Sequence, residues 1–159
     1  MSPHVPRKEG FKMMRLIATC MIFLFVTLQC SRDPDLALIQ SARLGDAEAI
    51  EQYLAGGASP NVQDRKGKTA LMEAASTGQT NIVRLLLSKG SDINICDRNG
   101  WTAIMHAASH GQLDIVHLLI SKGASVNART SENVTALQLA MKGNHVETAE
   151  LLRMAGAKE

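Results

Sequence analysis

Two histidines four residues apart have the spacing in this sequence that most resembles part of a metal site. His106 and His110 would lie on the same face of a helix, because a helix completes one turn in about 3.6 residues. A zinc ion needs three or four protein ligands, and Glu73, which lies earlier in the chain within a similar stretch of sequence, could supply a third. The simpler interpretation is that both histidines are exposed polar residues. We therefore predict no metal and no other cofactor, and keep a metal-binding protein using His106 and His110 as an alternative.

The other residues that could take part in catalysis give little support for an enzyme. A nucleophilic serine needs a base and a third, orienting group that converge in space. Ser76 and Ser109 lie at equivalent positions of two similar stretches. Repetition of the sequence explains their recurrence better than selection for a reactive serine does. The cysteines Cys20, Cys30 and Cys96 form no CxxC motif for a metal or redox site. We predict that the protein is not an enzyme.

The elements that must position these residues are repeated along the chain. The stretch at 67–78 reads GKTALMEAASTG, and it returns at 100–111 as GWTAIMHAASHG. After the same interval, and again without a gap, the chain reads NVTALQLA at 133–140. A fixed period of roughly 20–50 residues is typical of a stacked array of one supersecondary unit.

The sequence of each repeated unit predicts two helices and a hairpin. Thr69 has the position of an N-cap for a first helix with small apolar residues at helical spacing. An apolar second helix follows at 81–88, and Lys89 and Gly90 end it with a cation and a flexible residue. Residues 91–99 then predict an extended hairpin. A single unit cannot bury both of its apolar faces, so stacking must supply the stability.

The run Gly-x-Thr-Ala-Leu-Met-x-Ala-Ala at 67–75, with Gly78 after it, resembles an ankyrin repeat. The resemblance covers about residues 34–157 and implies an all-α repeat solenoid, in which stacked ankyrin helix-turn-helix pairs are joined by β-hairpin loops. The last repeat departs from the pattern, because Asn133 and Asn144 stand where the middle repeats have glycine. We divide the chain into a signal peptide or lipoprotein leader at 1–29, a linker at 30–34, and repeats at 35–66, 67–99, 100–132 and 133–159, of which the first and last cap the array.

The first thirty residues predict export. Four basic residues precede an apolar run at 16–28, which is the pattern of a secretory signal. As a spanning helix the run would be short, about 20 Å long against a hydrocarbon core about 30 Å thick. Cys30 follows this run and resembles the acylated cysteine of bacterial lipoproteins, although Leu28 and Gln29 depart from the usual motif. We predict lipidation at Cys30 and a location in the periplasm or on the outer surface. A cleaved soluble form, an uncleaved anchor and a mis-assigned leader on an intracellular adaptor remain alternatives.

Charge argues against a nucleic-acid partner. The full chain has a formal net charge of +2, but residues 1–29 carry four basic and one acidic residue. Their removal leaves 13 basic and 14 acidic residues, and nucleic-acid binding needs a basic surface. Membrane contact is expected only through the leader or its lipid.

The ankyrin resemblance also implies a binding surface. Hairpin tips and first helices of such arrays form an elongated concave face on which a partner protein docks. Carried onto this sequence, the partner-binding residues are Arg65, Lys66, Lys68, Arg98, Asn99, Trp101 and Glu132 near the tips, and Met72, Met105, His106 and His110 on the helices. Trp101 would be either a hot spot for binding or a packing residue of its own hairpin. We therefore expect a monomeric, non-catalytic protein–protein interaction module of the bacterial cell envelope, whose partner the sequence does not identify.

Overall fold

The computed structural model describes residues 34–158, and the predicted leader and Cys30 lie outside them. In the described part, eight helices form four consecutive pairs. The pairs are α2 (Pro34–Leu44) with α3 (Ala47–Ala55), α4 (Ala70–Ser76) with α5 (Thr80–Ser88), α6 (Ala103–Ser109) with α7 (Leu113–Ser121), and α8 (Ala136–Lys142) with α9 (Val146–Met154). None of these helices is long and apolar enough to span a membrane.

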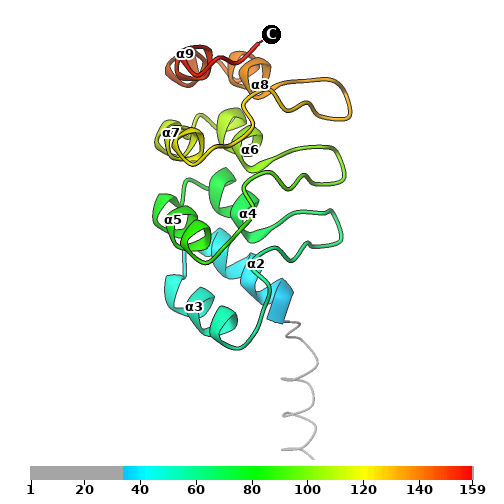
Figure 1. Cartoon of the computed structure of the whole chain (residues 1–159), viewed down its shortest axis with the longest axis vertical. Coiled ribbons are helices and arrows are strands. Elements are labelled where there is room, and N and C mark those ends of the chain that lie inside the picture. The colour runs from blue at the N-terminus through cyan, green and yellow to red at the C-terminus, as the bar shows by residue number, and fades with distance from the viewer. Residues whose placement is uncertain (1–33, 159) are drawn as a thin grey trace, which may run out of the picture. The chain divides into compact units, whose positions relative to one another are not determined.

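The helices form two columns within the array. Figure 1 shows α2, α4, α6 and α8 in the column beside the hairpin loops, and α3, α5, α7 and α9 in the other column. We call the first set the inner helices and the second set the outer helices. This arrangement confirms the all-α repeat solenoid. Between the repeats of the described part, regular sheet is absent, and the hairpins contain one isolated antiparallel bridge, between Cys96 and Thr102.

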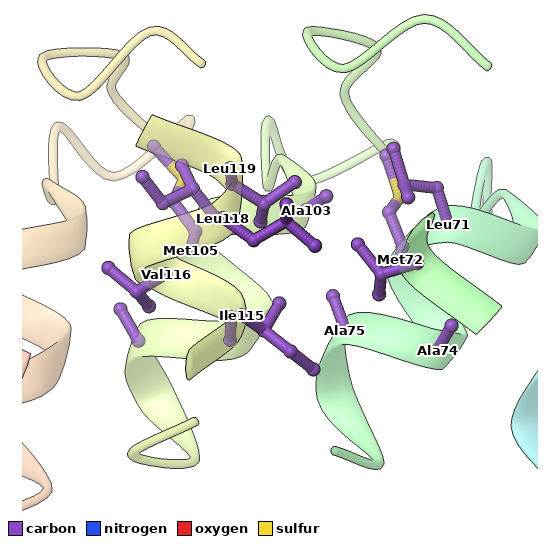
Figure 2. Close-up of a cluster of buried hydrophobic side chains, with 14 of the residues drawn as sticks. Leu71, Met72, Ala74, Ala75, Ala103, Met105, Ile115, Val116, Leu118 and Leu119 are labelled. Atoms are coloured by element: carbon purple, nitrogen blue, oxygen red, sulfur yellow. The ribbon is translucent and has the colours of Figure 1, made fainter. Parts of the chain in front are cut away.

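Small side chains let the inner helices approach one another closely. Ala74 and Ala75 of α4 and Ala107 and Ala108 of α6 are completely buried. The contacts of α2 with α4, α4 with α6 and α6 with α8 are more extensive than those between successive outer helices. Figure 2 shows part of this aliphatic core, with buried side chains from α4, α6 and α7. The core is therefore continuous from repeat to repeat, as stacking requires.

Threonine starts three of the inner helices, but it does not make the same hydrogen bond in each. The Oγ1 of Thr69 accepts from the backbone N–H of Met72 at 3.3 Å. Thr135 accepts in the same way from Gln138, whose side chain accepts from the Thr135 N–H and completes a capping box. Thr102, at the start of α6, makes no such bond. Its buried Oγ1 has no hydrogen-bond partner among the described residues.

The asparagines of the last repeat preserve the glycine conformation. Asn133 and Asn144 have φ values of 63° and 57°, in the left-handed region that asparagine tolerates better than most residues. Gly67 and Gly100 have the same sign of φ, and a Cβ on either would lie 2.9 Å from a backbone nitrogen of the following hairpin. Asn133 belongs to the last hairpin, so this second constraint does not apply to it. Among the described residues, no following hairpin therefore opposes asparagine at this position.

Candidate protein-binding surface

One side chain holds each hairpin turn. Oδ1 of Asp64 accepts hydrogen bonds from the backbone N–H groups two and four residues further on, both at 2.8 Å. Asp97 makes the same pair of bonds at 2.9 Å. Oγ1 of Thr130 makes them at 3.3 and 3.1 Å. Sequence reasoning missed these three residues, although their equal spacing and their place three positions before Gly67, Gly100 or Asn133 could have revealed them.

Neighbouring hairpins are bonded to each other at their tips. The backbone N–H of Arg98 donates to the carbonyl oxygen of Lys66 at 3.0 Å. One repeat later, the N–H of Ser131 donates to the carbonyl oxygen of Asn99 at 2.9 Å, and the Ser131 hydroxyl donates to the same oxygen at 3.0 Å. The turns are thus held from within and joined to one another, which limits relative movement of the side chains they carry.

These hairpins present a continuous set of exposed side chains, which we call the tip row. Its members are Arg65, Lys66, Arg98, Asn99, Ser131 and Glu132, all of them exposed. Within the tip row, the positive charges are on the first two hairpins and the negative charge is Glu132 on the third. The structure therefore brings five of the predicted partner-binding residues together on one edge of the array.

Lys68 and Glu73 form an ion pair at the base of the first hairpin, whose turn lies at residues 64–68. The Nζ of Lys68 lies 2.8 Å from Oε1 of Glu73, and the two side chains are 27% and 15% exposed. Lys68 was predicted as a partner-binding cation. Its charge is instead largely compensated within the repeat, so it contributes less to the tip surface than Arg65 or Lys66.

The equivalent positions in the third repeat hold Trp101 and His106. The ring centroids of these residues are 5.1 Å apart, at an interplanar angle of 44°. Trp101 is half-buried and packs against the hydrophobic core. The Nε2 of His106 lies 3.3 Å from Oδ2 of Asp97, and these two side chains are only 8% and 5% exposed. Trp101 thus combines packing contacts with a partly accessible ring.

The surroundings of His106 favour the neutral form of its imidazole. Burial lowers the pKa of His106 below its usual range, and the nearby Lys68 ammonium lowers it further. The Asp97 and Glu73 carboxylates act in the opposite direction without reversing the shift. A neutral imidazole that meets a carboxylate donates from Nε2, so His106 secures the turn residue Asp97.

Three predicted helix contacts are wrong. Met72 and Met105 are 1% and 0% exposed, and His106 is 6% exposed, so none of them lies on an accessible surface. The reason is that α4 and α6 each pack against two neighbouring inner helices and against their own outer helix, and Figure 2 shows their side chains in this shared core. His110 is exposed, as expected, at the end of α6.

The two histidines do not converge on a common point. His106 faces Asp97, whereas the Nδ1 of His110 lies 2.9 Å from the backbone oxygen of His106 and 3.0 Å from the Ser109 hydroxyl. Within residues 34–158, no group of three or more His, Cys, Asp or Glu side chains could hold a metal ion. The geometry therefore gives the metal-binding alternative no support.

Comparison with known proteins agrees with the repeat architecture. A family model described as ankyrin repeats (3 copies) matches residues 38–130 and, in a second overlapping match, residues 89–158. No curated protein matches the chain. Ankyrin repeats are generally non-catalytic. The chain belongs to the ankyrin-repeat family, and its repeats form a protein–protein interaction module.

Proposed function

We propose that this protein holds a partner protein against the tip row and the hairpin-side face of the array, and that it does so outside the cytoplasm. The observation that carries the binding proposal is the set of exposed side chains on turns that are bonded internally and to each other. A surface ordered before binding loses less conformational entropy when a partner docks, and so converts more of its contacts into affinity.

The composition of the tip row suits recognition by charge. Arg65, Lys66 and Arg98 extend into solvent, with Glu132 on the last hairpin. Such exposed charges chiefly select the partner and speed its approach, because opposite potentials attract before contact. The accessible part of Trp101 adds an aromatic contact below the tips. This surface has no need of a reactive group.

The location rests on the sequence of the leader alone. Basic residues before an apolar run favour export of the downstream chain, because positive flanking segments stay on the cytoplasmic side. Acylation of Cys30 would then tether the array to a membrane through the short segment at 30–34. A tethered module of this kind would act on proteins of the cell envelope.

Binding is tested with two double variants of equal charge change. Arg65→Ser with Arg98→Ser removes two cations of the tip row, and Arg84→Ser with Lys122→Ser removes two exposed cations from the outer-helix side. Recovery of partners from envelope extracts by the full chain should fall about tenfold in the first variant, a loss of about 1.4 kcal/mol. It should stay near the wild-type level in the second variant. Equal recovery by both variants would refute a binding role for the tip row.

The location is tested by the intact mass of the native protein from membranes, beside a Cys30→Ser variant. The expected mass is that of residues 30–159 with acyl chains, and the variant should lack it. A full-length mass without acylation would contradict the lipoprotein proposal. Cell fractionation would then distinguish an uncleaved anchor from an intracellular adaptor.

A further inference from the structure

A depression between the first two repeats is lined by both charged and apolar side chains, whereas the tip row has only polar and charged ones. It has a volume of about 310 Å³ and lies between the N-terminal inner helix α2 and the first hairpin, at residues 64–68. Its lining residues are Leu36, Ile39, Gln40, Arg43, Asp64, Lys66, Lys68 and Glu73. We call it the α2 depression.

The α2 depression has an apolar part because α2 differs from the other inner helices. It contains 11 residues where α4, α6 and α8 contain 7, and it begins before the position that threonine occupies in the later repeats. Leu36 stands at that position and is 50% exposed, with Ile39 one turn further along and 7% exposed. An exposed leucine beside a largely buried isoleucine offers a contact for one apolar side chain of a ligand.

Some charged groups that line the α2 depression have partners within the described part, and two of its cations form no ion pair there. Glu73 pairs with Lys68 at 2.8 Å, and Oδ1 of Asp64 accepts two backbone N–H groups of its own turn. The two remaining cations, Arg43 and Lys66, are exposed and form no ion pair with any residue of the described part. The depression therefore combines a mostly polar lining, in which two cations form no ion pair among the described residues, with the exposed apolar side chain of Leu36.

Arg65 and Arg98 add two further cations along the tip row. Both are exposed, and the backbone of Arg98 is bonded to that of Lys66, which places the next hairpin beside Lys66. The carboxylates of Asp64 and Glu73 lie within the lining, so the depression is not uniformly cationic. This combination favours separate carboxylates around an apolar side chain over a continuous polyphosphate.

We infer that the α2 depression binds an acidic segment of the partner protein, with one apolar side chain on Leu36 and Ile39 and flanking carboxylates on Arg43 and Lys66. The inference rests on the proposed function and specifies the chemistry of the partner. The guanidinium of Arg43 can bind a carboxylate through two parallel hydrogen bonds, whereas the Lys66 ammonium acts as a point charge.

The test is selection of peptides from a random display library by the full chain. Enriched peptides should carry two or more Asp or Glu residues around a Leu, Ile, Met or Phe. A synthetic peptide of the enriched sequence should bind about tenfold more weakly to the Arg43→Gln, Lys66→Gln double variant, as loss of about 1.4 kcal/mol requires. The double variant Arg84→Gln, Lys122→Gln is the matched control, and its affinity should change by less than about twofold.

Two further variants separate charge, apolar contact and folding. Leu36→Ser should abolish the preference for an apolar residue while retaining the preference for acidic ones. The charge-retaining variant Lys66→Arg should keep wild-type affinity. If substitutions at this position simply disrupted the hairpin, this variant would also lose affinity. Higher salt should weaken the peptide complex, because ions screen exposed charges.

Several results would overturn the inference. Enrichment of neutral or basic peptides, no enrichment, or equal weakening by the two charge-removing variants would each do so. A further such result is a peptide that keeps its affinity for the Arg43→Gln, Lys66→Gln variant and loses it for an Arg98→Gln variant. That result would refute the α2 depression as the site and leave the tip row as a binding surface. Binding to phosphatidylglycerol vesicles without any peptide binding would instead identify a lipid surface as the ligand.

Discussion

The second and third repeats have the same backbone and different chemistry at the base of their hairpins. In the second repeat, Lys68 and Glu73 form a partly exposed ion pair. In the third, the equivalent positions hold Trp101 and His106, and the imidazole contacts the buried carboxylate of Asp97. The turns have matching hydrogen bonds in both repeats, so the same backbone accommodates either pair. The difference makes the base of the hairpin more polar in the second repeat than in the third.

The core beneath the two hairpins should respond equally to mutation, which gives the largest expected effect. Met72 and Met105 occupy equivalent buried positions. Met72→Ala and Met105→Ala should each lower the free energy of unfolding by about 2–5 kcal/mol, because each leaves a cavity in the aliphatic core. Urea denaturation of the two variants measures this. Losses below about 0.5 kcal/mol, as for an exposed residue, would restore these methionines to the binding surface.

The turn aspartates should differ in importance. Asp97→Ala removes two bonds to backbone N–H groups and leaves buried His106 without its acceptor, at a cost of about 2–3 kcal/mol in unfolding free energy. Asp64→Ala removes the two backbone bonds alone and should cost about 1 kcal/mol. The Asp→Asn change at each site is the control, since its oxygen can still accept. Equal losses at the two sites would show that the His106 contact adds nothing to stability.

The threonines before the inner helices should also differ. Thr69→Val removes a capping bond and should cost about 1 kcal/mol in unfolding free energy. Thr102→Val replaces a hydroxyl that is buried without a partner among the described residues and should change stability by less than about 0.5 kcal/mol, or increase it. Thermal and urea unfolding of the two variants test the contrast. A comparable loss at Thr102 would mean that its hydroxyl does have a partner in solution.

The smallest expected effect is a dependence on pH specific to the third repeat. Because the folded-state pKa of His106 is lowered, the unfolded chain binds a proton at this residue more readily. The stability that neutral His106 contributes is complete above the unfolded value of about 6.5 and falls as the pH drops toward the folded-state pKa. The stability difference between wild type and His106→Gln should therefore shrink between about pH 7.5 and about pH 5.5. Parallel stability curves would contradict this.

The sequence predicts the array of repeats well, because similar stretches at a fixed interval are what a stack of equal units requires. Thr69 as a helix cap and the exposure of Arg65, Lys66 and Arg98 follow from local patterns, and the structure agrees. Helical periodicity identifies one buried face, whereas an inner helix of seven residues is covered on several sides by other elements. For that reason the burial of Met105 and His106 could not be read from spacing alone.

Contacts between different elements are the part of the site that local patterns do not reveal. Asp97 lies in a turn and His106 in a helix further along the chain, and nothing local in the sequence indicates that they meet. The α2 depression likewise depends on a turn and on two helices, α2 and α4, from different repeats. Such contacts follow from the stacking geometry and become visible only when the repeats are placed against each other.

Partners are proposed to bind the hairpin side of the array. The most direct measurement is photo-crosslinking in cells, with a photoreactive amino acid placed singly at Arg65, Asn99 or Glu132, and at exposed Asn81 or His117 on the outer helices as controls. We predict that the three tip positions crosslink to the same partner protein and that the outer-helix positions do not. Crosslinking from the outer helices, or none from the tips, would show that partners do not bind the hairpin side.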